Sequence, residues 1–398
     1  MKEKINILQF TPYFPPHKWG VETVAEEIAD YWTKKWYWEV INITFDVWQK
    51  SPHPQSLSLV GERSIRSYNQ KWYKVFLIPS FDIIPNFPVP KFWKKDFWRV
   101  LKELRSYISE NKNTRVVSHT RFFLSSFIAG IFARKNKLQW IHIEHGSDYV
   151  KLSSMLKSKI SYIYDKIIWK WIFKRADKIL AISEACKKFI IKEFIVREVE
   201  VFYRGVVFSN KLPEVENLSE KFTWKKIIGF VGRLLKWKNV ESLIIAYNNI
   251  LKLEKEDIQL IIVWDWEDFN RLVELDKENT IYFTWSKSFE KALAYQQQFD
   301  IHIHPSSPWG GLATTLLQAM NYGCYIVATP NEWAKEVIVD WDNWILVKDD
   351  SVEEIQKWIS EALIHFDKKI EYSEKNQKII ENNFSWEKNI EVLFDKVK

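Results

Sequence analysis

The sequence predicts an α/β protein with two doubly wound domains, each built around a parallel sheet. Short apolar runs rich in β-branched residues alternate with helical patterns almost throughout, as expected when helices connect parallel strands. A polar segment at residues 208–224 interrupts this alternation, which then begins again. The length of 398 residues also suits two domains.

The first half predicts an N-terminal Rossmann-like domain over residues 1–207, which we expect on the acceptor side of a ligand site. Its strand candidates are Ile5–Phe10, Glu39–Phe45, Lys74–Ile78, Arg115–Ser118, Gln139–Glu144, Lys178–Ile182 and Glu198–Phe202. Its helical patterns include Val21–Lys35, Arg121–Lys135 and Glu184–Phe194. Residues 48–73 have no readable pattern.

After the linker 208–224, a second Rossmann-like domain is predicted over residues 225–384. Its strand candidates are Lys226–Val231, Gln259–Val263, Thr280–Phe283, Asp300–His304 and Tyr325–Thr329, and its helices are Val240–Lys252, Ser286–Gln297 and Thr314–Tyr322. Residues 385–398 are expected to form a C-terminal helix that packs back on the first domain. Doubly wound sheets bind ligands at the carboxyl ends of their strands, so we expect the domains to face each other across a cleft.

Several protein classes are excluded by composition. No apolar run approaches the ~18 residues that a membrane span needs. The apolar stretch Ile5–Phe10 is too short for a signal peptide and lacks a small-residue cleavage site. Two cysteines, Cys186 and Cys324, cannot form a disulfide framework or a zinc site by themselves. We therefore expect a cytoplasmic protein.

The glycine and tryptophan counts are both unusual. Average usage of about 7% would give about 28 glycines in a chain of this length. The sequence instead has 10 glycines and 22 tryptophans. Some tryptophans, such as Trp264 and Trp266 directly after a strand, stand where the backbone freedom of glycine is usually needed. Either the source organism reads UGA codons as glycine, or the protein is unusually rich in tryptophan.

Charge is divided unevenly between the two halves. Residues 1–205 hold 35 basic and 20 acidic side chains, a net charge of +15, so the overall +7 leaves −8 for the remainder. A basic first half suits an anionic partner, either phosphate or a lipid surface, although a solvated surface without a partner is the alternative. No recognition module for nucleic acid accompanies this charge, so nucleic acid is not expected as a partner.

Residues 157–175 mix cations and aromatic side chains at roughly helical spacing. Such a helix can lie on an anionic membrane surface, with lysine side chains reaching the headgroups. The alternative is an amphipathic helix that faces the core and has a solvated basic side. The first interpretation makes the protein a peripheral membrane protein on the inner face of the membrane.

Two turns that follow predicted strands are candidate anion sites. The first strand leads through Trp19 and Gly20 into a helix, and a glycine at position 19 would make a Gly-Gly turn whose N–H groups face an anion. Arg233 and Lys238 follow the first strand of the second domain. A guanidinium fork and an ammonium point charge suit a diphosphate. The alternative for the first turn is that glycine serves the turn geometry only. The alternative for Arg233 and Lys238 is that they are two solvated surface cations.

The segment 302–320 is the richest in candidate ligand contacts. A strand ends at His304, a glycine loop follows, and a helix begins near residue 314 with hydroxyl groups in its first turn. Loop N–H groups can approach a sugar diphosphate, and a glutamine amide one turn into the helix can bind ribose hydroxyls. The candidate donor-binding residues here are Gly310, Gly311, Leu312, Thr314 and Gln318.

The order of these segments, followed by Ala328-Thr329-Pro330-Asn331-Glu332, resembles the retaining GT-B glycosyltransferases of the glycosyl transferases group 1 (family 4-like) type. The resemblance covers nearly the whole chain. It implies a metal-independent hexosyltransferase-type enzyme without a cofactor. Such an enzyme moves a sugar from a UDP- or GDP-linked nucleotide sugar to a hydroxyl of a lipid-linked or glycan acceptor.

The resemblance also implies roles for particular residues. Trp19 and Gly20 would approach the donor diphosphate, and Arg233 and Lys238 would neutralise the leaving diphosphate. His145, at the end of a first-domain strand, would lie near the transferred sugar.

The chain departs from the family at its E-x7-E motif. The two glutamate positions fall on Gly310 and Gln318, so neither carboxylate is present. A carboxylate nucleophile at position 310 is therefore excluded, whereas front-face transfer, in which the leaving phosphate helps deprotonate the acceptor, needs none. An enzyme is expected, and a catalytically inactive nucleotide-sugar-binding protein is the alternative.

Four further histidines require interpretation. His119 ends a predicted strand at the same sheet edge as His145, where it lines the acceptor side or is a buried structural residue. His142 lies within a strand, so we expect it to pack in the interior. His302 and His304 fall on one face of a strand, but no third ligand is evident, so a metal site is not expected.

Overall fold

The computed structural model forms two α/β units, as predicted from the sequence. One compact unit comprises Met1–Arg204 and Ile390–Lys398, and the other comprises Gly205–Asn389. The structure describes residues 4–15, 20–36, 38–47, 58–60, 65–70, 73–84, 87–149, 155–196, 198–206, 211–232, 234–253, 257–263, 269–285, 287–306, 313–329, 334–337, 345–346 and 348–398.

The sheet of the first unit has a parallel centre and an antiparallel edge. Its strands are β1 (Asn6–Phe10), β2 (Val40–Asp46), β3 (Ser58–Val60), β4 (Ile65–Gln70), β5 (Tyr73–Ile84), β6 (Phe87–Pro90), β7 (Thr114–His119), β8 (Gln139–Glu144), β9 (Lys178–Ala181) and β10 (Glu200–Val201). Their order is β10-β9-β8-β7-β1-β2-β5-β4-β3, and β6 pairs with β5. The pairs from β10 to β5 are parallel, whereas β3, β4 and β6 pair antiparallel.

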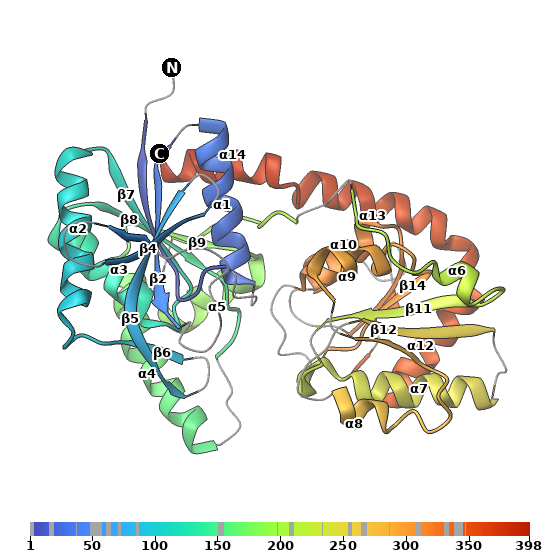
Figure 1. Ribbon diagram of the computed structural model, residues 1–398. Helices are drawn as coiled ribbons and strands as arrows, with labels where there is room; N and C mark the ends of the chain where they lie inside the picture. Colours follow the sequence, from blue (N-terminus) through green and yellow to red (C-terminus); the bar gives the residue numbers. More distant parts are fainter. Residues whose placement is uncertain are drawn as a thin grey trace. The chain divides into compact units, whose positions relative to one another are not determined.

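Helices cover both faces of this sheet, which makes it doubly wound (Figure 1). They are α1 (Val21–Trp36), α2 (Lys95–Glu110), α3 (Leu124–Lys135), α4 (Met155–Arg175), α5 (Glu184–Phe194) and the end of α14 (Trp386–Val397). Alternation along β1 sends Leu8 and Phe10 into the core beneath α2 and α3, whereas Gln9 bonds to the Ala25 carbonyl of α1 on the opposite face. The ring of Phe394 in α14 stacks on Trp38, with centroids 4.7 Å apart.

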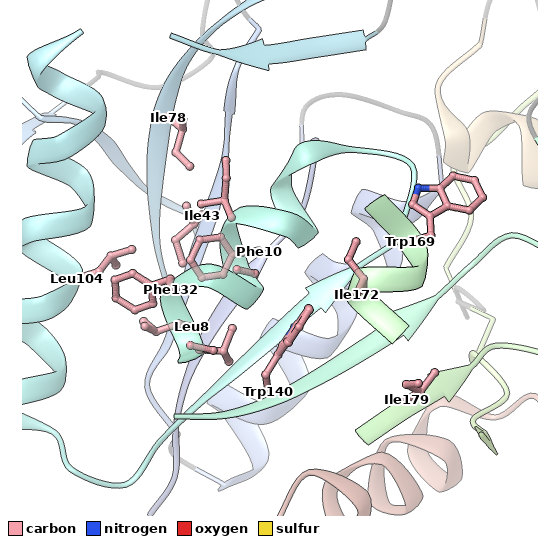
Figure 2. Close-up of a cluster of buried hydrophobic side chains, with 14 of the residues drawn as sticks. Leu8, Phe10, Ile43, Ile78, Leu104, Phe132, Trp140, Trp169, Ile172 and Ile179 are labelled. Atoms are coloured by element: carbon pink, nitrogen blue, oxygen red, sulfur yellow. The ribbon is translucent and has the colours of Figure 1, made fainter. Parts of the chain in front are cut away.

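The core of the first unit is rich in aromatic side chains (Figure 2). Trp140 of β8 and Trp169 of α4 are both fully buried in this core. Trp140 occupies the space left by Gly130 in α3, since a Cβ on that glycine would lie 2.4 Å from its ring. Its Nε1 donates to Ser118 Oγ at 2.8 Å, so the one polar atom of the indole is satisfied.

The second unit has an entirely parallel sheet over its described strands. These are β11 (Lys226–Val231), β12 (Ile258–Val263), β13 (Tyr282–Thr284), β14 (Ile301–His304), β15 (Tyr325–Ala328) and β16 (Ile345–Leu346), in the order β13-β12-β11-β14-β15-β16. Helices α7 (Val240–Leu253), α8 (Phe269–Val273) and α12 (Val352–Ile364) lie on one face, and α9 (Phe289–Gln296) and α10 (Thr314–Asn321) on the other (Figure 1). The remaining described helices are α6 (Leu218–Lys221), α11 (Ala334–Val337) and α13 (Lys369–Asn383).

Part of the segment predicted as a linker packs against the second unit. Its residues 218–221 form α6, and Leu218 is fully buried. The N–H of Leu218 donates to Gln298 Oε1 at 2.8 Å, so this part of the segment is attached to the second unit rather than free in solvent.

Tryptophan occurs in two contrasting environments. Trp224 has a φ of +70°, and its side chain is 92% exposed. A left-handed backbone favours glycine, and an exposed indole contributes no packing there. By contrast, Trp32, Trp140 and Trp169 are fully buried. The environment at 224 therefore favours the glycine interpretation at that position, whereas the three buried residues suit tryptophan.

Mass spectrometry of the protein from its native source is therefore expected to find glycine at position 224 and tryptophan at 140 and 169. The same measurement also reports on positions 237, 264 and 266. Tryptophan at all four of 224, 237, 264 and 266 would contradict the recoding hypothesis.

Candidate functional site

Polar side chains gather at the carboxyl end of β14 in the second unit. His302 and His304 lie on the same face of the strand, as alternation predicts, with their rings 6.4 Å apart. Gln296 of α9 donates from Nε2 to the Thr315 carbonyl at 2.8 Å, which ties α9 to α10. His304 Nδ1 and Ser306 Oγ are buried and make no hydrogen bond within the described residues.

Gln318 is the most unusual polar residue of α10. It is fully buried, and neither its amide nitrogen nor its amide oxygen has a hydrogen-bond partner in the part of the chain that the structure describes. The helix begins at Thr314, as the sequence predicts, and its N-cap, Ala313, has no side-chain cap. An uncapped helix start and an unpaired buried amide are both groups that a polar ligand would satisfy.

Lys238 is held in a tight turn between β11 and α7. It ends the short 3-10 helix Lys236–Lys238, and the following Asn239, with a φ of +52°, donates to the Asp350 carbonyl at 2.6 Å. Burial lowers the pKa of His302 to about 3 and also lowers the pKa of His304, and the nearby Lys238 charge adds to both effects. The structure thus brings Lys238 close to the end of β14.

Five sequence-predicted residues lie outside the described residues: Trp19, Arg233, Gly310, Gly311 and Leu312. Their assignments remain predictions. Gly20, His145, Lys238, Thr314 and Gln318 are described.

The first unit holds a second polar region near Gly20 and Arg204. Gly20 has a φ of +120° directly before α1, a conformation that requires glycine. Glu22 in the first turn of α1 is fully buried, and Arg204 is 6% exposed. Burial lowers the pKa of Arg204 to about 10, and the carboxylate of Glu22 opposes this shift. A buried cation and a buried carboxylate therefore lie close to each other at this helix start.

His145 follows the end of β8 and is partly buried. Its Nε2 lies 3.1 Å from Nδ1 of His119, the last residue of β7. His119 is fully buried, and its Nε2 lies 3.1 Å from Gln9 Oε1. Desolvation, together with the charge of Arg204, lowers the pKa of His145 to about 3, although the carboxylate of Glu144 opposes the shift. His119 is thus a buried histidine with both ring nitrogens bonded, and it contacts the predicted sugar-side residue directly.

The turn that carries His145 is fixed by a buried ion pair. Arg121 Nη1 donates to Glu144 Oε1 at 2.6 Å and to the Gly146 carbonyl at 2.8 Å. Glu144 Oε1 also accepts from the backbone N–H groups of His145 and Gly146. Burial alone would raise the pKa of Glu144, but Arg121 and the hydrogen bonds hold it at about 2. The carboxylate therefore stays charged and holds the turn in place.

His142 packs in the interior, as predicted. Its Nδ1 lies 2.9 Å from Ser118 Oγ and its Nε2 lies 3.2 Å from Glu144 Oε2, and the side chain is fully buried. Among the described residues, no group of three or more His, Cys, Asp or Glu side chains is placed to hold a metal ion.

Helix α4 has one face that packs on the core and an opposite face that carries lysines and apolar side chains in solvent. Ser161, Asp165 and Trp169 are buried against the core. The opposite face carries Ile163 and Ile167, which are 57% and 65% exposed, beside exposed lysines. Within the described residues, no helix is both long and apolar enough to cross a membrane.

Three polar residues of the first unit could not be identified from the sequence. Gln9 and Asn42 lie in the middle of apolar strands, where a single polar residue gives no periodic signal. Arg204 follows the last predicted strand of the first domain without any motif around it. Burial identifies all three in the structure, and Gln9 and Asn42 are also joined by a hydrogen bond.

Comparison with known proteins places these regions in context. Residues 20–209 match the family model described as Glycosyltransferase Family 4, and residues 213–386 match Glycosyl transferases group 1. The chain is 40% identical over 395 residues to an uncharacterized glycosyltransferase (MJ1069) of Methanocaldococcus jannaschii, covering 97% of this chain and 96% of that protein.

Two further proteins are similar to parts or all of the chain. A GDP-mannose-dependent alpha-mannosyltransferase of Mycolicibacterium smegmatis is 26% identical over 198 residues, 48% of this chain and 50% of that protein. The fold matches that of Anabaena HepE in complex with UDP-glucose, with a TM-score of 0.68 and 13% identity over 98% of this chain and 99% of that one. The chain therefore has the GT-B fold and belongs to the glycosyltransferases of group 1 and family 4, which depend on nucleotide sugars.

Proposed function

We propose that this glycosyltransferase transfers a hexose from a UDP- or GDP-linked donor to a hydroxyl of a lipid-linked or glycan acceptor, with retention, in cell-envelope polysaccharide or glycolipid synthesis. The observation that carries this proposal is the set of unpaired buried polar groups on His304, Ser306 and Gln318, with Lys238 nearby. Such groups are costly in an empty site and are satisfied by a polar ligand.

The chemistry follows from charge that develops on the leaving diphosphate. Lys238, the N–H groups at the start of α10 and, by the family resemblance, Arg233 would stabilise that charge. Gln318 would hold the ribose hydroxyls through its unpaired amide. Because residues 310 and 318 carry no carboxylate, the leaving phosphate itself would accept the proton of the acceptor hydroxyl in a front-face reaction.

A screen of UDP- and GDP-linked sugars against lipid and glycan acceptors tests this function. We expect one donor to be consumed with retention of anomeric configuration. Gln318→Ala should raise the KM for that donor about tenfold, because one amide that bonds a hydroxyl is worth about 1–1.5 kcal/mol. Gln356→Ala on α12 is the matched control and should leave the KM unchanged.

The alternative is an inactive nucleotide-sugar-binding protein, which the missing glutamates at 310 and 318 favour. It predicts that the donor binds, with weaker binding in the Gln318 variant, but that neither transfer nor hydrolysis occurs. Turnover by the wild-type protein separates the two.

We also propose that the protein acts at the cytoplasmic face of an anionic membrane, through the solvent-facing stripe of α4. This stripe consists of Lys159, Tyr162, Ile163, Lys166, Ile167 and Lys170. It alternates lysines with exposed apolar side chains, which can enter the headgroup region while the lysines meet lipid charge.

Flotation with vesicles of phosphatidylglycerol and phosphatidylcholine at low salt should recover the wild-type protein with the lipid. Ile163→Ser combined with Ile167→Ser should abolish flotation. Lys102→Glu, at an exposed position of α2, is the control and should have little effect. Wild-type protein that stays in the aqueous fraction would refute membrane binding.

A further inference from the structure

A chain of buried hydrogen bonds leads from helix α1 to His145. Gln9 Nε2 lies 2.8 Å from the Ala25 carbonyl oxygen and 2.6 Å from Asn42 Oδ1. Gln9 Oε1 lies 3.1 Å from His119 Nε2, and His119 Nδ1 lies 3.1 Å from His145 Nε2. Gln9 and His119 are fully buried, so water does not compete for these bonds.

The donor and the acceptor of every hydrogen bond in this chain follow from the first bond, between Gln9 and the Ala25 carbonyl. The Ala25 carbonyl can only accept a hydrogen bond, so the Gln9 atom that faces it must be the amide nitrogen. The Gln9 oxygen therefore faces His119, whose Nε2 must carry the proton. A neutral His119 then has a bare Nδ1, which can only accept, so His145 must donate from Nε2.

Both imidazoles are neutral. Burial lowers the pKa of His119 well below its usual value, and the adjacent His145 and His142 act in the same direction. Desolvation and Arg204 lower the pKa of His145, against the opposing charge of Glu144. A neutral His145 that donates from Nε2 has a bare Nδ1. No hydrogen bond within the described residues uses that atom.

We infer that Gln9 and His119 are positioning residues that fix His145 as the Nε2–H tautomer, so that its Nδ1 accepts a hydrogen bond from a hydroxyl of the donor sugar. This inference rests on the proposed function for the identity of the ligand. It gives His145 one chemical role, because a ring fixed in this way cannot donate a proton to the sugar or to the leaving group.

Nitrogen-15 NMR of histidine-labelled protein tests the tautomer without any substrate. At pH 7 the His145 signals, identified by their loss in His145→Gln, should show a protonated Nε2 and a bare Nδ1, with a protected Nε2 proton. His119→Leu should remove that protection, and His119→Asn should restore it, because the amide oxygen of asparagine can reach the place of Nδ1. Ser126→Ala, which removes bonds to the carbonyls of His119 and Thr120 only, is the structural control.

Kinetics with UDP-glucose and GDP-mannose as probes then test the positioning role. His119→Leu should lower kcat about tenfold or more with a smaller change in the donor KM. His119→Asn should recover most of that loss, and Ser126→Ala should leave kcat close to that of the wild type.

Three results would overturn the inference: a proton on Nδ1 of His145, an imidazolium at pH 7, or a His119→Leu variant with unchanged Nε2 protection and kcat. If wild-type protein neither binds nor turns over any nucleotide sugar, the proposed function fails instead. The tautomer measurement still stands in that case, because it is made on the free protein.

Discussion

Lys238→Ala is expected to lower kcat by about 10²–10³-fold, the usual effect of removing one preorganised group that stabilises charge in a transition state. Lys238 lies close enough to β14 for its charge to lower the pKa of His304. The charge on the diphosphate grows as the sugar leaves, so the loss should appear mainly in kcat and less in the donor KM. Steady-state rates with the donor found in the screen would measure it.

Lys236→Ala is the matched control, because Lys236 lies in the same short helix but is exposed. It should change kcat by less than about twofold, since an exposed charge is screened by solvent. A Lys238 variant with the kcat of the wild type would contradict the assigned role. Arg233→Ala tests the partner assigned by resemblance and is expected to lose a similar factor.

Asp165→Asn is expected to stabilise the first unit at pH 7.5 and to remove a pH dependence of its unfolding. Asp165 on α4 is fully buried, and neither carboxyl oxygen has a hydrogen-bond partner within the described residues. Burial raises its pKa to about 8, although Arg121 opposes the shift. Between about pH 4 and pH 8 the folded state therefore keeps this carboxyl protonated, whereas the unfolded chain ionises it.

The direction in which stability changes with pH follows from the number of protons that the folded and unfolded states bind. Between pH 4 and pH 8 the folded state holds one proton more than the unfolded state at this group, so stability falls as the pH rises, by up to about 1.4 kcal/mol per pH unit. Urea unfolding at pH 5.5 and 7.5 should show that the advantage of Asp165→Asn over wild type grows by roughly 2–3 kcal/mol. Ser161→Ala, one turn earlier on the same helix, should show no such growth. An advantage that is equal at both pH values would refute the raised pKa.

The central strands could be predicted because most of their residues are β-branched or aromatic, and the helices because their apolar residues recur at helical spacing. Gln139–Glu144 and Lys226–Val231 were predicted with the bounds that the structure shows. Strands β3, β4 and β6 were missed. They form the antiparallel edge, where polar residues and short lengths such as Ser58–Val60 leave no periodic signal.

The candidate site was predictable only where a motif surrounds the residue. Lys238 and Gln318 were identified from the loop and helix around them, and the structure describes both at the second sheet. The contact between His119 and His145 was not predictable, because it depends on the side-by-side pairing of β7 and β8. A strand order that brings residues 26 positions apart into contact is a tertiary property. Arg204 and Gln9 depend on burial, which no local pattern reports.

Helix α14 has a consequence for synthesis of the protein. The first unit includes Ile390–Lys398, and Phe394 packs on Trp38. A ribosome that has made only residues 1–204 has therefore not yet supplied a part of that unit. Nascent chains would present the unoccupied Trp38 surface until residues 390–398 have left the ribosome, so the first unit would be completed only after the second unit has been made.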